Sequence, residues 1–229
     1  MNWLTPDDLT ALAVTLKLAT VTVALLIVLG TPLAWWLART QWRGKPVIEA
    51  LVALPLVLPP TVLGFYMLVL LGPNGTVGKT LESLGYPHLA FSFTGLVIGS
   101  LLFSLPFAIQ PLQNAFASIG DRALEAASTL RANALDRFVS VALPLARRGY
   151  LTAITLSFAH TLGEFGVVLM IGGNIPGETR VVSIAIYDHT QAFDYAAAHR
   201  LSALLLGMSF LMLFVVYAVN RRMAQARLV

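Results

Sequence analysis

The sequence contains no cysteine and little charge. Only 11% of its 229 residues are charged, while 57% are hydrophobic. The absence of cysteine excludes a disulfide framework, a thiolate nucleophile and a cysteine-ligated metal site. A soluble domain normally carries about 25% charged residues, so a chain with so little charge cannot cover its surface for water. With a mean hydropathy of +0.78, the composition predicts a protein embedded in a lipid bilayer.

Residues suited to catalysis are also lacking. No nucleophile stands beside a base, and the four histidines are scattered along the chain: His88, His160, His189 and His199. The segment 73–80 nearly matches the phosphate-binding P-loop GxxxxGK[ST], but Pro73 stands at its first position and no strand precedes it. We therefore expect that this chain alone is no enzyme, and that it binds no metal and no cofactor.

Long apolar runs are abundant. A bilayer core of about 30 Å requires about 20 mostly apolar residues in a helix. Open sheet edges cannot be satisfied in hydrocarbon, which excludes long strands. The sequence therefore predicts one all-α domain over 1–229, a polytopic membrane helix bundle of about five transmembrane helices with a core of about 12–219. The expected spans run from about Leu12 to Leu37, Val47 to Leu71, Phe93 to Pro111, Tyr150 to Ile171 and Leu201 to Val219.

Basic residues gather on one side of these five spans. Eleven of the fifteen Lys and Arg residues lie in the segments 38–46 and 112–149 or after residue 219. Cytoplasmic loops carry an excess of Lys and Arg, so we expect the amino terminus outside and the carboxyl terminus in the cytoplasm. The net charge of +4 then reflects membrane topology, and we expect no nucleic acid partner.

Prolines interrupt the second span at Pro55, Pro59 and Pro60. Each proline removes a backbone donor and tends to kink its helix. Two interpretations stay open: ordinary bending, which membrane bundles tolerate, or a broken helix that lines a pathway or gate. Pro59 and Pro60 are therefore candidate gate residues.

The longest expected cytoplasmic segment, about 114–146, has the pattern of an amphipathic helix. Small and apolar residues recur at three- and four-residue spacings and form one face. They are Ala123, Ala126, Ala127, Leu130, Ala134 and Phe138. Such a helix could lie on the membrane surface or dock into a groove of a partner protein.

The residues of this segment favour a partner protein. Glu125-Ala126-Ala127 is followed after three residues by position 131, and after nine more by Val141, Ala142, Leu143 and Pro144. This spacing resembles the EAA loop of permease subunits in binding-protein-dependent ABC importers: EAA, three residues, Gly, nine residues, Ile, any residue, Leu-Pro. The resemblance implies a coupling helix that sits in a cleft of an ATPase subunit. The implied coupling residues are Glu125, Ala126, Ala127, Leu130, Arg131, Leu143 and Pro144.

Arg131 departs from the pattern of that family, which usually has glycine at this position. We expect the arginine to cost close packing, although its charge could pair with an acidic group on the partner.

Two later strings point to a substrate. Leu162-Gly163-Glu164-Phe165-Gly166 and the segment 174–180, NIPGETR, are similar to those of bacterial molybdate permeases, a type I family of the same class. The resemblance extends from about residue 12 to residue 219. Sulfate permeases share the LGEFG string, so sulfate or tungstate is the alternative substrate. The resemblance implies alternating access by a homodimer, with two cytoplasmic ATP-binding subunits that use ATP and Mg²⁺, and a periplasmic molybdate-binding protein.

Glu164 lies within an expected span, where burying a carboxylate costs free energy unless the group finds a partner. It lies about 24 Å along a helix from Arg148, near the outer interface. A neighbouring helix could satisfy it, or it could serve a gate together with Gly163, Phe165 and Gly166. Direct molybdate binding by Glu164 is disfavoured, because like charges repel.

The remaining candidates lie outside the spans. Asn174, Glu178 and Arg180 are candidate contacts of the binding protein, with Arg180 able to pair with Glu178 instead. A secondary transporter is the rival class, but it would normally show internal repeats and charges at the midplane. Neither is visible in the sequence.

Overall fold

The structure is a computed structural model that describes residues 3–225, and those residues are mostly helical and contain no strand. The twelve α-helices of this part are α1 Pro6–Arg39, α2 Lys45–Ala53, α3 Pro60–Leu71, α4 Thr76–Ser83, α5 Phe93–Ala117, α6 Asp121–Thr129, α7 Ala134–Arg137, α8 Leu143–Leu145, α9 Arg147–Leu162, α10 Gly166–Gly172, α11 Val182–Gln191 and α12 Tyr195–Gln225. A 3-10 turn, Leu54–Leu56, follows α2, and a π-helical turn, Phe138–Ala142, precedes α8. Arg227, which contributes to the expected orientation, lies outside the described residues.

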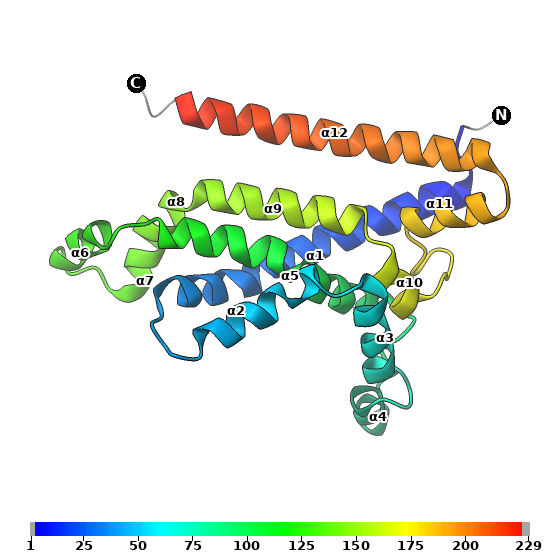
Figure 1. The fold of residues 1–229 in the computed structure, drawn as a ribbon, viewed down its shortest axis with the longest axis horizontal. Helices are drawn as coiled ribbons and strands as arrows, with labels where there is room; N and C mark the ends of the chain where they lie inside the picture. The colour runs from blue at the N-terminus through cyan, green and yellow to red at the C-terminus, as the bar shows by residue number, and fades with distance from the viewer. Residues whose placement is uncertain (1–2, 226–229) are drawn as a thin grey trace.

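Three long helices form the centre of the bundle. Helix α1 packs along α5, and both pack against α9. Their contacts bury one apolar cluster toward the α10 end, which includes Leu18, Leu96 and Ile171. A second cluster toward the α6 end includes Leu37 and Phe116. Figure 1 shows the two ends clearly: α6 and α7 lie at one, and α10, α11 and the described amino-terminal residues lie at the other.

Helix α12 is long and apolar but sparsely packed within the chain. It contacts α11 and α9, and in Figure 1 it runs beside the bundle with little cover. Large apolar side chains such as Leu206, Phe210 and Phe214 are exposed along it. An apolar helix with this much exposed surface fits a lipid environment.

The expected fold class is confirmed. Four helical segments of the described chain are long and apolar enough to cross a bilayer, and α9 with α10, bent by 61°, makes a fifth if the pair is one span. Prolines 106 and 111 lie inside α5 without ending it, and α5 continues six residues beyond the expected limit at Pro111.

A continuous second span over 47–71 is wrong. The chain leaves helical geometry at residues 57–59, between the 3-10 turn and α3. Proline 60 disfavours helical geometry at Pro59, which has extended dihedrals, φ −56° and ψ 136°. Figure 1 shows α2 along the bundle and α3 turned away from it, with α4 beyond. The broken-helix interpretation of these prolines is therefore the one that the structure supports.

Candidate functional site

The segment between α5 and α9 is not the single amphipathic helix that its pattern predicts. Helix α6 ends at Thr129, and residues 130–133 form a turn before the short helix α7. Asn133 begins α7 by accepting a hydrogen bond from the Asp136 amide at 2.8 Å. Across the turn, Arg137 donates to the Ser128 hydroxyl at 2.8 Å. The segment is a helical hairpin, held by polar contacts between its two arms.

The turn after α6 is a Schellman motif. The Arg131 amide donates to the Ser128 carbonyl at 2.9 Å, and the Ala132 amide donates to the Ala127 carbonyl at 3.1 Å. This motif requires a left-handed residue after the helix, which is usually glycine. Arg131 fills that place with φ +62°. The cost of the arginine within the chain is therefore backbone strain, and its side chain is exposed.

The hairpin presents apolar side chains to its surroundings. Leu130 is 83% exposed and Leu135 is 71% exposed, although both lie next to charged residues in the sequence. Glu125 and Ala126 are exposed, and Ala127 is partly so. Leu143 and Pro144, at the other end of the predicted motif, lie in α8 and are also exposed. The seven predicted coupling residues thus form an uncovered surface at one end of the bundle.

One arginine ties the start of this hairpin to the membrane helices. Arg39, the last residue of α1, donates to the Asp121 carboxylate at 2.6 Å and to the Ile119 carbonyl at 2.9 Å. Its guanidinium also lies 5.0 Å from the ring of Trp35. Because Asp121 is the first residue of α6, these bonds fix where the helix leaves the bundle.

Aromatic rings attach the other end of the hairpin to the membrane helices. Phe138, in the π-helical turn, packs edge-on against Trp35 at 5.3 Å and lies 5.9 Å from Phe116. Phe116 in turn packs against Tyr150, whose hydroxyl donates to Thr31 at 3.0 Å. The hairpin is therefore fastened to α1 at both ends and to α5 at the second end. Sequence reasoning missed Arg39 as an anchor, since it looked like one more basic residue of a loop.

The fourth span breaks at residues 163–165, between α9 and α10. Glu164 occupies the break and is 96% buried. Its Oε2 accepts a hydrogen bond from Ser100 at 2.8 Å, and its backbone carbonyl accepts one from Ser183 at 2.6 Å. Its Oε1 has no hydrogen-bond partner within the described chain. A neighbouring helix thus satisfies Glu164 only in part.

A cavity of about 570 Å³, called the outer cavity because it lies toward the end of the bundle that is expected to face outward, lies beside the two helix breaks. Pro60 and Thr61 line it from the start of α3, and Gly163, Glu164, Phe165 and Gly166 line it from the second break. Five of the six predicted gate residues therefore meet in one place, although more than a hundred residues separate the two segments. Pro59 immediately precedes this group.

Two glycines of the LGEFG string differ in their surroundings. A Cβ atom on Gly166 would lie 2.7 Å from Cβ of Pro60, well inside contact distance. A Cβ atom on Gly163 would meet nothing closer than 3.9 Å. Gly166 therefore permits α10 to approach α3, as does Gly64 on α3, where a Cβ atom would lie 2.7 Å from Cβ of Met170.

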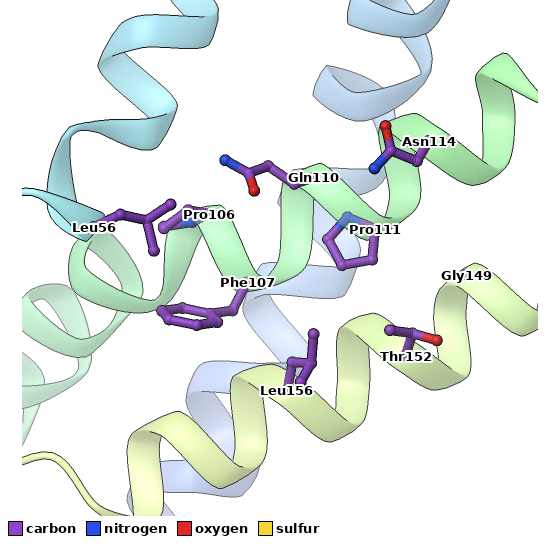
Figure 2. A pocket seen from close by; sticks show the side chains of 9 residues that line it. All are labelled: Leu56, Pro106, Phe107, Gln110, Pro111, Asn114, Gly149, Thr152 and Leu156. Atoms are coloured by element: carbon purple, nitrogen blue, oxygen red, sulfur yellow. The ribbon is translucent and has the colours of Figure 1, made fainter. Parts of the chain in front are cut away.

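An inner cavity of about 460 Å³ lies on the same face of the bundle, toward the α6 end. Figure 2 shows Phe107 and Pro111 on the side of α5 that faces α9, with Thr152 and Leu156 opposite. Gln110 and Asn114 also line this cavity and are exposed. They supply uncharged polar groups in an otherwise apolar lining.

The outer loop has a pairing that differs from the expected one. Arg180 lies 2.9 Å from Asp188 rather than beside Glu178, and Asn174 donates to the same carboxylate at 2.7 Å. Two of the three candidate binding-protein contacts are thus already engaged within the chain, while Glu178 is exposed. Within residues 3–225, no three His, Asp or Glu side chains lie close enough together to hold a metal ion.

The sequence of the chain also matches a known family. The sequence pattern of the binding-protein-dependent transport system inner membrane component matches residues 30–225. The chain belongs to this family. The molybdenum transport system permease protein ModB of Azotobacter vinelandii is 58% identical over 218 residues, which cover 95% of this permease and 96% of that protein. The sulfate transport system permease protein CysT of Salmonella typhimurium is 34% identical over 217 residues, covering 95% and 78%.

Solved structures agree with the fold. A chain of a bacterial alginate ABC transporter, crystallised with an alginate-bound periplasmic protein, superposes with a TM-score of 0.79 at 17% identity. The match covers 96% of this permease and 80% of that chain. At this identity the likeness concerns the fold alone.

Replacement of Arg131 by glycine should stabilise the permease. A non-glycine residue in a strained backbone conformation costs about 1–3 kcal/mol, so Arg131→Gly should raise the midpoint of thermal unfolding of the purified protein. Arg131→Ala is the matched control, because it removes the side chain and keeps the strain. Equal midpoints for the two variants would contradict the assignment of strain to this turn.

The two glycines of the LGEFG string should respond differently to alanine. Gly166→Ala forces α10 away from Pro60 and should cost about 1–3 kcal/mol, as overpacking does. Gly163→Ala should be tolerated, because its new methyl group meets only ordinary contacts. Thermal unfolding of the two purified variants measures the difference, and a Gly163→Ala loss as large as that of Gly166→Ala would show the explanation to be wrong.

Proposed function

We propose that this permease forms the membrane pathway of an ATP-driven importer for molybdate. The 58% identity to a molybdenum transport permease over 95% of the chain carries the proposal. Sulfate permeases reach 34%, and sulfate or tungstate is the alternative substrate. A secondary transporter is disfavoured, because it has no need of a hairpin that docks to an ATPase.

The working unit is a homodimer with two ATP-binding subunits and a periplasmic molybdate-binding protein. Both cavities open on the same face of α5 and α9, and two copies that meet through this face would enclose a central path. The chain acts as one domain, and ATP and Mg²⁺ bind the ATPase subunits rather than this chain. The hairpin end faces the cytoplasm, which puts the amino terminus in the periplasm and the carboxyl terminus in the cytoplasm.

Coupling follows from the exposed hairpin. The surface of Glu125, Ala126, Ala127 and Leu130 inserts into a cleft of the ATPase subunit, whose closure on ATP moves the hairpin. Because Arg39 and Phe138 fasten the hairpin to α1 and α5, that movement reaches the membrane helices as a rigid displacement. Alternating access then results from a change in how these helices face the second copy.

Uptake by the reconstituted complex tests the function directly. Vesicles containing the permease, its ATPase and its binding protein should take up radiolabelled molybdate only with ATP, and excess sulfate should not block this uptake. If excess sulfate abolished the uptake, the substrate would be sulfate rather than molybdate. Uptake without ATP would contradict the proposal of an ATP-driven importer and would favour a secondary transporter.

Changes on the hairpin surface should uncouple the complex without unfolding the permease. Glu125→Arg reverses a charge on an exposed side chain, and Ala127→Trp adds bulk where the resemblance places a close helix contact. Both variants should fail to co-purify with the ATPase and should lose uptake. Glu82→Arg, an exposed carboxylate at the opposite end of the chain's helices, is the control. Normal uptake and co-purification of the hairpin variants would refute the coupling role.

Loss of the Arg39 anchor should weaken coupling rather than binding. Arg39→Ala removes one hydrogen bond to the Ile119 carbonyl and one to the Asp121 carboxylate. Each bond contributes at most about 3 kcal/mol to the stability of the folded permease. The variant should still co-purify with the ATPase but transport fewer molybdate ions per ATP hydrolysed. Lys45→Ala, which removes an exposed ion pair 3.7 Å long to Glu49, is the matched control. An unchanged ratio in Arg39→Ala would show that the anchor transmits nothing.

A further inference from the structure

The two cavities are stacked along the same pair of helices and separated by aromatic rings. On α5, Phe103 lines the outer cavity and Phe107 lines the inner one. On α9, which runs the opposite way, His160 lines the outer cavity and Leu156 the inner one. A solute that moves along this face must therefore pass these rings.

His160 closes the space between the two phenylalanines. Its ring is stacked on Phe107, with centroids 4.1 Å apart and planes inclined by 27°, and lies 4.7 Å from the centroid of Phe103. Its Nδ1 is 2.9 Å from the Ser104 hydroxyl, which is itself 3.1 Å from the Thr161 hydroxyl. Three side chains of α5 thus hold one imidazole of α9 in place.

The stack lies at the middle of α5 and near the end of α9. Helix α5 has 25 residues, about 38 Å at 1.5 Å per residue, and Phe103 and Phe107 lie on either side of its midpoint. Apolar constrictions of this kind stop ions by excluding water. An oxyanion cannot shed its hydration to cross aromatic rings that offer it no charge in return.

We propose that His160, clamped between Phe103 and Phe107, is the seal that separates the outer half of the transport pathway from the inner half. The proposal rests on the proposed function only in placing the pathway on the α5–α9 face, and it does not depend on which oxyanion is carried. His160 lies two residues before the end of α9 and next to the 163–165 break. A shift of the last turn of α9 would withdraw the imidazole from the stack and open the path.

Cysteine accessibility tests the seal, because the sequence has no cysteine of its own. Thr61→Cys places a single thiol in the outer cavity, and Thr152→Cys places one in the inner cavity. A membrane-impermeant cationic methanethiosulfonate is added to one side of sealed vesicles that contain the ATP-free complex, and labelling of this chain is measured by mass spectrometry. Each thiol should react from its own side only. Leu84→Cys and Leu135→Cys, both well exposed at opposite ends of the chain, report the orientation of the vesicles.

Removal of the imidazole should open the path to the reagent. In His160→Ala, the thiol at position 152 should react from the outer side about tenfold faster than in the parent or more. A tenfold rise in rate corresponds to a modest fall in the free-energy barrier that the reagent crosses. His160→Phe should stay sealed, since it keeps the ring and loses only the hydrogen bond to Ser104. Phe210→Ala, on the exposed face of α12, is the control for loss of an aromatic ring. Labelling from both sides in the parent, or a sealed His160→Ala, would overturn the proposal.

Failure of this proposal and failure of the proposed function are distinguishable. The labelling requires neither ATP nor molybdate, so a complex that carries sulfate would give the same sealed pattern. A variant that misfolds is recognised by loss of co-purification with the ATPase. In that case, Phe107→Ala provides the second route, since it opens one side of the stack while leaving His160 bound to Ser104.

Discussion

A helix that breaks inside a bilayer must have its freed backbone groups satisfied by protein or water, because hydrocarbon offers no hydrogen bonds. That constraint explains why the two breaks of this permease, at 57–59 and 163–165, border one cavity. Ser183 donates to the carbonyl that the second break frees, and Ser100 donates to the Glu164 carboxylate. The contact of Gly166 with Pro60 then fixes α10 on α3. The proposed pathway face of α5 and α9 depends on this packed pair of breaks.

At the other end of the bundle, the hairpin of α6 and α7 is held by contacts within itself and with the membrane helices. A hairpin with the proposed coupling role must be rigid and must be fastened to the membrane helices. The Schellman turn and the Arg137–Ser128 bond make the hairpin rigid. Arg39 and the ring of Phe138 fasten it at its two ends. Because both anchors reach α1, and the second also reaches α5, a displacement of the hairpin acts on α5, one of the two helices that carry the proposed aromatic seal.

The helical bundle was predictable, because long apolar runs are strong local signals, whereas the pattern of residues 114–146 predicted one amphipathic helix and not the hairpin of α6 and α7. The prolines near the break at 57–59 left two interpretations open, a bent helix and a broken one, and the sequence did not decide between them. The break at 163–165 was not, since the apolar pattern runs through it, although the two glycines that flank Glu164 were a signal. The turn at Arg131 was hidden because arginine replaces the glycine that normally marks a Schellman motif. The partners of His160 and Arg39 come from distant segments, so no local pattern could reveal them.

The central claim is that two copies of the chain meet through the α5–α9 face and enclose both cavities. Cross-linking of the otherwise cysteine-free permease in its membrane tests this most directly. Gln110→Cys, exposed at the inner cavity, should join two copies when a short thiol-specific cross-linker is added. Leu29→Cys, on an exposed part of α1 in an apolar groove with α5, should not. Cross-linking through position 29 but not through position 110 would contradict the account.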